Sequence, residues 1–260
     1  MTMSDATLTT ALLVLARVAG LLVAAPLFGH LMVPKRVRAG LAAMIALALV
    51  PAVAGMGPAP TPPASVWDLG GMLTVETAIG VLLGSVAQFL FAGVQLGGQL
   101  AGMQMGFGLS NLIDPQSHAQ LTIVAQWQQL MAFLIFLVLD IHHLLIAALL
   151  ASFHTVPVGG LLISAAGLRG TVVLAGEIFA IGVRIAAPVM VALLLANAAL
   201  GVLARTIPQL NVFVVGFPVN VGVGLLMLGA SLPFTFRLLA ERFGGLEPTL
   251  DSLVRGFAHG

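Results

Sequence analysis

Several long apolar runs place the strongest limit on what this chain can fold into. The longest cover residues 8–31, 72–105, 171–203 and 212–236. A run of about 18 or more apolar residues can cross the ~30 Å hydrocarbon core of a bilayer as a helix. Only 7% of the 260 residues are charged, whereas a soluble domain carries roughly 25%, so lipid or other helices must surround these runs. The sequence therefore predicts an all-α polytopic membrane protein with about six long apolar helices, in a single membrane domain over residues 1–260.

The composition and the motifs exclude several kinds of site. The net charge is +1 and no basic stripe is present, so no nucleic-acid partner is predicted. The chain contains no cysteine, which rules out disulfides, thiolate nucleophiles and cysteine-based zinc sites. No G-x-S-x-G elbow, P-loop or G-x-G-x-x-G fingerprint occurs. The sequence predicts neither a catalytic site nor a cofactor.

Two histidines and an aspartate lie close together in the fourth apolar run, which extends to about residue 152. In a helix, the adjacent His142 and His143 point about 100° apart, which is poor geometry for sharing a metal ion. No metal site is predicted. Asp140, His142 and His143 are instead expected to mark a helix end at a polar boundary.

The apolar runs differ from simple spans in length, and the basic residues disagree about topology. The second run begins near residue 39 and soon reaches Pro51, whereas residues 171–203 would measure about 50 Å as one straight helix. The positive-inside rule places the basic loop of Lys35, Arg36 and Arg38 in the cytoplasm. A short polar tail that carries Arg237, Arg242 and Arg255 ends the chain. These arginines favour the cytoplasm too, although six full spans would put the two basic groups on opposite sides. The helices are therefore expected to be irregular.

Four charged residues lie inside apolar runs: Arg17, Glu76, Glu177 and Arg184. An isolated charge at membrane depth costs about 2.5–3.5 kcal/mol on insertion scales, so each should face a partner or water. Glu177 and Arg184 share a helix face but lie about 10.5 Å apart along its axis, too far to pair directly. The four charges fit either salt bridges between helices or subunits, or a path for ions or protons.

Glycines at a spacing of four follow the third run. They are Gly80 with Gly84, Gly93 with Gly97, and Gly98 with Gly102 and Gly106. Such small residues on one face let two helix backbones approach closely. Glutamines also flank the end of this run: Gln88, Gln95, Gln99, Gln104, Gln116, Gln120, Gln126, Gln128 and Gln129. These side chains fit hydrogen bonds between helices or the lining of a wet, uncharged passage.

A polar hinge over residues 106–116 separates the third run from the fourth. Asp114 followed by Pro115 has the pattern of an N-cap and a first helical residue, so a helix should restart there. Apolar side chains accompany the hinge: Met103, Met105, Phe107, Leu109, Leu112 and Ile113. Methionine adapts its shape readily, so Met103 and Met105 suit a reversible seal. The alternative is an ordinary loop between two helices.

Four stretches in chain order carry a family resemblance. They are RVAG and APLFG within residues 17–29, VPKRVR over 33–38, GMQMGFGL and IDPQ within 102–116, and PQLNVF and VGFP within 208–218. With these stretches the chain resembles the FliR family, the flagellar branch of the type III secretion export-gate proteins. The third stretch is the most specific of the four.

The resemblance implies a structural pore subunit and not an enzyme. Its fold would consist of kinked helical hairpins, lifted partly out of the bilayer plane, which would reconcile the conflicting basic residues. Its partners would be FliP-like, FliQ-like and FlhB-like subunits and unfolded protein substrates. Its location would be the flagellar basal body in the bacterial inner membrane.

The resemblance also implies that the loop beginning at residue 106 acts as a plug in the closed pore. This role is carried onto Gly106, Phe107, Gly108, Leu109, Asn111, Ile113 and Asp114. Two alternatives stay open. One is the equivalent subunit of a virulence secretion system. The other is a small secondary transporter that uses Glu177 and Arg184 as a coupling pair, although the internal repeats typical of such transporters are not evident.

Overall fold

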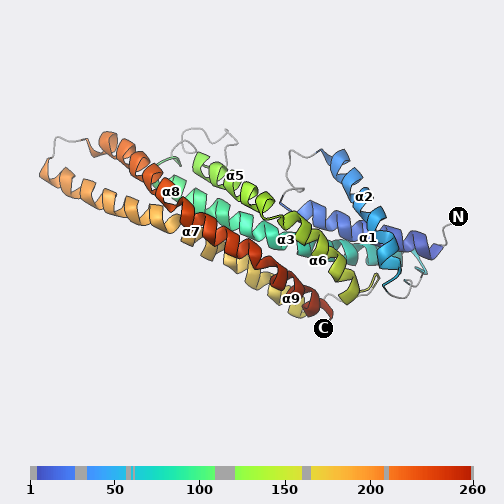
Figure 1. Cartoon of the computed structure of the whole chain (residues 1–260). Helices are drawn as coiled ribbons and strands as arrows, with labels where there is room; N and C mark the ends of the chain where they lie inside the picture. The colour runs from blue at the N-terminus through green and yellow to red at the C-terminus, as the bar shows by residue number, and fades with distance from the viewer. Residues whose placement is uncertain are drawn as a thin grey trace. The chain divides into compact units, whose positions relative to one another are not determined.

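A computed structural model describes residues 5–26, 34–56, 60, 62–108, 121–159, 165–207 and 211–258, and these residues form helices and short connections without any strand. The helices are α1 (Asp5–Ala24), α2 (Lys35–Ala54), α3 (Val66–Gln104), α5 (Ile123–Val138), α6 (Ile141–Thr155), α7 (Ala165–Thr206), α8 (Val212–Gly244) and α9 (Leu246–Ala258) (Figure 1). Five are long and apolar enough to cross a membrane, or up to six if α5 and α6 together count as one broken span. The predicted all-α polytopic fold is confirmed.

The chain divides into two compact units. Unit 1 contains Met1–Phe89, Leu139–Ala175 and Phe243–Gly260, and unit 2 contains Leu90–Val138 and Gly176–Arg242. The long helices α3, α7 and α8 run through both units, so each unit is assembled from segments far apart in the sequence. That residues 1–260 act as one membrane domain stays a prediction.

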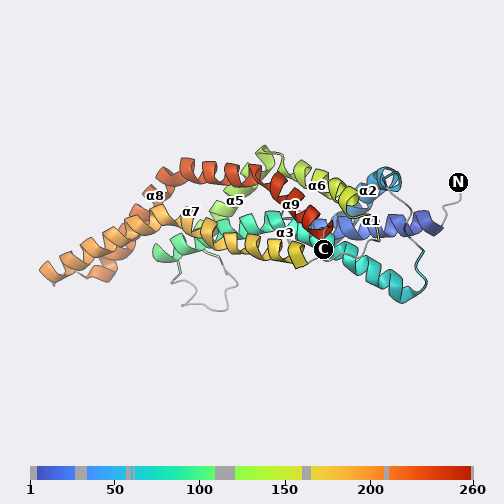
Figure 2. The same cartoon turned by 90° about the horizontal axis from the view of Figure 1, so that it is seen from below.

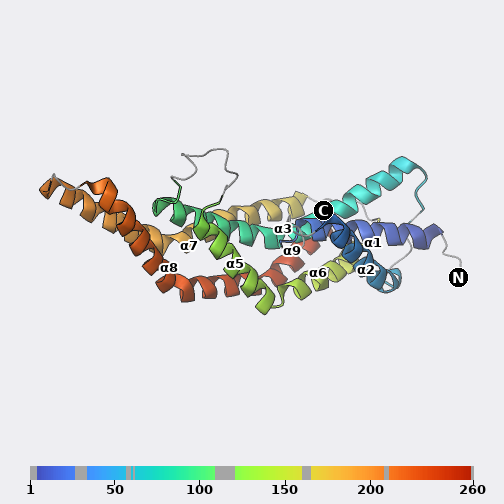
Figure 3. The ribbon, with the colours of Figure 1, turned by 90° about the horizontal axis from the view of Figure 1, so that it is seen from above.

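In unit 1, α1 and α3 cross at a very short distance because both carry glycine at the crossing. A Cβ atom on Gly20 would meet the carbonyl oxygen of Thr77, and one on Gly80 would meet that of Arg17. At Gly84 the added atom would lie 2.6 Å from the carbonyl oxygen of Leu21. α2 lies against α1 on the same unit (Figure 2 and Figure 3). The first glycine pair predicted from the sequence therefore serves the close helix approach expected of it.

Unit 1 also contains a helix that the sequence analysis missed. The C-terminal segment was expected to be a short polar tail, but residues Leu246–Ala258 form α9, which contacts α6. Leu246, Leu250 and Leu253 are 3%, 1% and 4% exposed and lie on one helical face. This spacing of three to four residues is the usual sign of an amphipathic helix, and it was available in the sequence.

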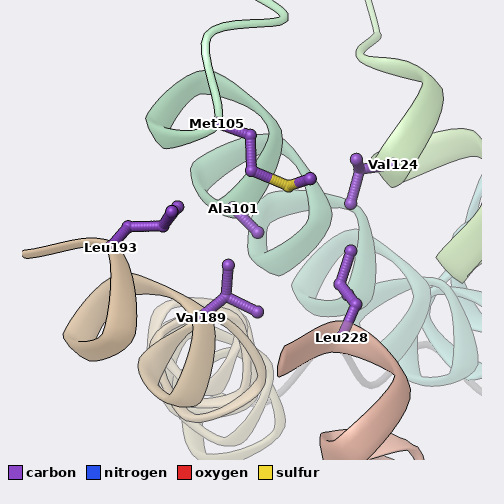
Figure 4. Packing of buried hydrophobic residues seen from close by; sticks show 6 residues of the cluster. All are labelled: Ala101, Met105, Val124, Val189, Leu193 and Leu228. Atoms are coloured by element: carbon purple, nitrogen blue, oxygen red, sulfur yellow. The ribbon is translucent and has the colours of Figure 1, made fainter. Parts of the chain in front are cut away.

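In unit 2, the end of α3 packs against three other helices. A buried cluster joins residues from α3, α5, α7 and α8: Ala101, Met105, Val124, Val189, Leu193 and Leu228 (Figure 4). Gly93 and Gly97 face Ile181 and Ile185 of α7, where an added Cβ would come within 3.0 Å and 2.9 Å of their Cβ atoms. Gly98 and Gly102 face the start of α5 in the same way. Each glycine pair of α3 in this unit therefore admits a different neighbour.

Several helices extend further than the apolar runs predicted. α2 begins at Lys35 and continues through Pro51, although the second run was expected to be short. α7 and α8 likewise contain Pro188, Pro218 and Pro233 without ending there. Proline is tolerated inside apolar helices when neighbouring groups satisfy the carbonyl that it leaves without a donor. α7 and α8 follow each other in the chain and run in opposite directions (Figure 1).

Candidate functional site

The candidate site begins where α3 ends, at the Gly106-Phe107-Gly108 sequence. The N–H of Phe107 donates to the carbonyl of Gly102 at 3.0 Å, and the N–H of Gly106 donates to that of Met103 at 3.0 Å. Gly106 has a φ of 99°. These two hydrogen bonds and the positive φ are those of a Schellman motif, which stops a helix and turns the chain away from it. Glycine is used at this position because a side chain there is strained.

The two methionines beside this turn have different surroundings. Met105 is fully buried in the cluster shown in Figure 4, with Phe107 packed against it. A Cβ atom on Gly224 of α8 would lie 2.5 Å from Cγ of Met105, so α8 passes close to it. Met103 is 51% exposed. Met105 thus packs the end of α3 into the core of unit 2, whereas Met103 is exposed on the surface of the chain.

The far end of the predicted plug loop returns to α3. Thr122 caps α5, since its Oγ1 accepts a hydrogen bond from the N–H of Ala125 at 3.2 Å. The N–H of Thr122 donates to Oε1 of Gln99 at 2.9 Å, and its hydroxyl donates to the carbonyl of Gly98 at 3.3 Å. The described residues on both sides of 109–120 are therefore bonded to the C-terminal part of α3. The predicted site residues Leu109, Asn111, Ile113 and Asp114, and the helix restart expected at Asp114-Pro115, lie outside the described residues.

The glutamines near this loop were predicted either to form hydrogen bonds between helices or to line a wet, uncharged passage. Gln99 bonds to Thr122, as above, and Nε2 of Gln126 donates to the carbonyl of Leu121 at 3.3 Å. Gln128 is 4% exposed, and its Oε1 has no hydrogen-bond partner within the described part of the chain. Gln99 thus joins α3 to the start of α5, Gln126 bonds within that start, and the buried Oε1 of Gln128 has no partner among the described residues.

Two of the four charges predicted inside the apolar runs pair with each other in unit 1. Nε of Arg17 donates to Oε2 of Glu76 at 2.6 Å, and the two side chains are 0% and 1% exposed. The other guanidinium nitrogens donate to Oγ of Ser152 and to the carbonyl of Val156, both at 3.1 Å. The guanidinium also lies 4.2 Å from the ring centroid of Phe153. This arrangement supports the salt-bridge reading and not an open path for ions.

The second oxygen of Glu76 completes the cluster. Its Oε1 accepts a hydrogen bond from the N–H of Gly159 at 2.9 Å. Both carboxylate oxygens and all guanidinium nitrogens therefore have partners, which a buried ion pair needs if it is to offset its desolvation cost. The cluster joins α1, α3 and the end of α6.

The other two predicted charges do not pair with each other. Oε2 of Glu177 accepts a hydrogen bond from Arg242 of α8 at 2.7 Å, and both side chains are partly exposed. Arg184 lies two turns further along α7, where it lines a groove between α7 and α8. The sequence predicted that each charge needs a partner, but it did not identify Arg242.

The basic residues Lys35, Arg36 and Arg38 form the first turn of α2 and not a loop. Lys35 and Arg36 are exposed, and Arg38 is partly buried. Cations at a helix N-terminus are electrostatically unfavourable because the helix dipole is positive there. Helix stability therefore does not explain these residues, and the cytoplasmic side that the positive-inside rule assigns to them stays a prediction.

Asp140, His142 and His143 lie closer together than expected. Residue 140 separates α5 from α6 with a left-handed backbone (φ 52°), which confirms the predicted helix end. The ligand atoms of the three side chains lie within 4.8 Å of one another, so these residues could hold a metal ion. The centroids of the two imidazole rings are 4.1 Å apart. That the chain binds no metal here stays a prediction.

Comparison with known proteins gives a consistent result over almost the whole chain. Residues 8–246 match the family described as bacterial export proteins, family 1. The flagellar biosynthetic protein FliR of Escherichia coli (strain K12) is 35% identical over 243 residues, which cover 92% of each protein. FliR of Bacillus subtilis (strain 168) is 34% identical over 248 residues, covering 94% of this chain and 93% of the relative. FliR of Caulobacter vibrioides is 31% identical over 240 residues, covering 90% and 92%.

Proposed function

Because this chain belongs to family 1 of the bacterial export proteins, we propose that it is a structural pore subunit of the flagellar protein-export gate. The observation that carries the proposal is the similarity to flagellar FliR proteins over about nine-tenths of both chains. The helices match this role, since at least five can cross a membrane. The protein acts in the inner membrane, at the flagellar basal body.

The gate is assembled with FliP-like, FliQ-like and FlhB-like subunits, and unfolded flagellar proteins pass through it. Large apolar side chains exposed on α7 and α8 support assembly with other helices. They include Phe179, Val183, Leu194, Leu195, Val202, Leu225, Leu226 and Phe236. The protein has no catalytic role in this proposal, because export needs a passage and a seal and no bond is made or broken by this subunit.

The loop that starts at Gly106 is the plug of the closed gate. Its two ends are held at the same end of α3, by the Schellman turn at Gly106 and by the bonds of Thr122 to Gln99 and Gly98. We assign the seal to the apolar residues Phe107, Leu109 and Ile113, together with Met103, which is exposed at the end of α3.

Deletion of residues 106–114 tests the plug. Cells that carry the deleted chain in an assembled gate should leak ions, measured as a loss of membrane potential and as sensitivity to external salt. A second variant replaces residues 109–114 with glycine and serine, which keeps the loop length and the Schellman turn but removes Leu109 and Ile113 from the seal. It should leak as well. A tight membrane in both strains, with the gate assembled at its normal level, contradicts the plug assignment.

Two other functions are less well supported. The relatives named above are flagellar proteins, which favours the flagellar gate over a virulence secretion system. A secondary transporter would use Glu177 and Arg184 as a coupling pair, but Glu177 bonds to Arg242 instead. Neutralising Glu177 and Arg184 together and measuring solute uptake separates the transporter from the gate.

A further inference from the structure

Three side chains with metal-binding atoms meet at the start of α6, outside the plug loop. Asp140, His142 and His143 each offer one ligand atom, and these atoms lie within 4.8 Å of one another. All three residues belong to unit 1. No metal site was predicted from the sequence because adjacent residues of a helix point about 100° apart. The two rings nevertheless lie close together, with centroids 4.1 Å apart and planes inclined by 37°.

One oxygen of Asp140 is the point on which both rings converge. Its Oδ1 lies 3.5 Å from Nδ1 of His143 and 4.0 Å from Nε2 of His142. Within the described part of the chain, no lysine or arginine lies in ion-pair distance of Asp140. Its negative charge therefore has only the two imidazoles, or a cation from solution, as a close partner.

Asp140 occupies a position where its side chain usually has another role. It is the N-cap of α6, and an N-cap aspartate normally accepts a hydrogen bond from an N–H of the first turn. No such side-chain bond to the described first turn forms here. The N–H of His143 donates instead to the backbone carbonyl of Asp140, at 2.9 Å. The carboxylate is therefore not used by the helix end and can serve as a ligand.

The spacing of the ligand atoms fits a small divalent ion such as Zn²⁺. Zinc bonds to imidazole nitrogen and carboxylate oxygen measure about 2.0–2.2 Å, so two ligand atoms on a tetrahedral ion lie about 3.3–3.6 Å apart. The 3.5 Å between Asp140 and His143 already matches this value. The 4.0 Å between Asp140 and His142 needs a small rotation of one ring. Two histidines and one carboxylate are also a ligand set of zinc sites that keep an open coordination position.

A pocket beside His143 has room for the remaining ligands. It has a volume of about 490 Å³ and is lined by residues of α6 and α9. Ala147 and Ala148 line it from α6, and Glu247 and Asp251 line it from α9. Two carboxylates beside an imidazole favour a cation over an anion there. Water in this pocket can complete the coordination of an ion held by three side chains.

A hydrogen bond between one histidine and Asp140 is the simpler account of the cluster. Such a bond needs a single imidazole that donates to the carboxylate. It does not explain why both rings approach the same oxygen. An ion that both rings and the carboxylate can bind explains the convergence of all three.

From these observations we propose that Asp140, His142 and His143 bind one zinc ion at the start of α6. The proposal departs from the metal-free helix end expected from the sequence. It does not depend on the role of the chain in protein export, because it concerns side chains of unit 1 alone. The bound ion links the first turn of α6 to the residue that precedes this helix.

Zinc titration of the full-length chain tests the site. The chain is purified in detergent with a tag that contains no histidine, stripped with a chelator, and titrated with Zn²⁺ by calorimetry. The unmodified chain should bind an ion that the double variant His142→Ala with His143→Ala does not bind. Asp140→Asn should weaken this binding by about tenfold or more, since even changes around the ligands of a metal cost that much.

The matched control is another histidine of the same helix. His154→Ala removes an exposed histidine in the last turn of α6 and should bind zinc as the unmodified chain does. No zinc binding by the unmodified chain would overturn the proposal. Binding that the double variant retains at full affinity would overturn it as well, because the ion would then lie elsewhere.

Thermal unfolding and X-ray absorption guard against a misfolded variant that imitates the expected loss. Saturating Zn²⁺ should raise the unfolding midpoint of the unmodified chain and of His154→Ala but not of the double variant, because an ion bound only to the folded chain stabilises it. An equal rise in all three would contradict the site. If the double variant does not fold, X-ray absorption of the zinc-loaded unmodified chain takes its place. A spectrum with two imidazole ligands supports the site, and a spectrum without imidazole overturns it.

Discussion

At the scale of single residues, the buried pair of Arg17 and Glu76 makes the sharpest prediction. Arg17→Met would leave the carboxylate of Glu76 buried at 1% exposure with one hydrogen bond from Gly159. Breaking a buried pair by removing one partner costs about 3–5 kcal/mol. We expect a large decrease in the thermal unfolding midpoint of the detergent-solubilised protein. Size-exclusion chromatography after heating to a series of temperatures measures this midpoint.

The control for this prediction removes both charges. Arg17→Met with Glu76→Met leaves no uncompensated charge, so the double variant should recover much of the lost stability. Arg169→Met removes an exposed arginine of α7 and should change the midpoint little. A double variant less stable than Arg17→Met alone would contradict the explanation from unpaired charge.

The crossing of α1 and α3 gives a second prediction at this scale. Gly80→Ala places a Cβ atom against the backbone carbonyl of Arg17, which cannot rotate away, so the two helices must separate. Overpacking of this kind costs about 1–3 kcal/mol. Gly71→Ala, on the same helix, meets nothing within 4 Å and should be neutral or stabilising by about 0.5–1 kcal/mol, because alanine favours the helix. Equal midpoints for the two variants in thermal unfolding would refute the close contact.

The sequence alone predicted which residues need partners but not which partners they have. The need of a charge in an apolar run for a partner follows from the cost of burying that charge. The close helix approach at glycines spaced by four follows from their lack of a side chain. Both are local properties. The pairing of Arg17 with Glu76, 59 positions away, depends on how α1 crosses α3. The pairing of Glu177 with Arg242 across 65 positions depends likewise on α7 and α8. A single sequence carries no direct record of those crossings.

At the scale of the helix, the end of α3 depends on the positive φ of Gly106. Gly106→Ala should destabilise the last turn by about 1–2 kcal/mol, since a left-handed backbone costs an L-residue that much. Gly106→Asn should cost less, because asparagine tolerates this conformation better. Hydrogen exchange at the amide of Phe107, which bonds to Gly102, would measure the effect. Unchanged protection in Gly106→Ala would exclude the Schellman motif as the feature that stops the helix.

The extent of the helices was predicted less well than their number. The second run was expected to be short because it soon reaches Pro51, yet Pro51 lies inside α2, just as Pro188 and Pro233 lie inside α7 and α8. In water, proline ends a helix because the carbonyl that loses its N–H donor can bond to solvent in a turn. Apolar surroundings offer no solvent to that carbonyl. α9 was missed for a different reason. Its three leucines are spaced for one face, but the polar residues between them resembled a tail.

At the scale of the whole molecule, burial is distributed unevenly among the helices that can cross a membrane. In the most apolar stretches, 56% of the residues are buried inside the chain for α3, but only 33% for α7 and 22% for the span Val214–Leu253, which contains most of α8. α3 is thus covered by the chain itself, whereas α7 and α8 leave most of their surface to lipid or to other subunits. Neither the apolar composition nor the hydrophobic pattern distinguishes these cases, because a leucine that faces lipid and a leucine that faces another subunit look the same in the sequence.

Neighbouring leucines of α7 test whether other subunits cover the exposed surface. Leu193 is 0% exposed and Leu194 is 63% exposed. Leu193→Asn buries an amide in the chain's own core, which costs at least about 2 kcal/mol, so it should lower the unfolding midpoint of the purified chain and of the assembled complex. Leu194→Asn should leave the chain alone nearly unchanged and lower only the midpoint of the complex, because a partner that binds the folded chain stabilises it and a weaker contact lowers that stabilisation. If Leu194→Asn changes neither, this part of α7 faces lipid, and the docking surface of the chain must lie elsewhere on α7 and α8.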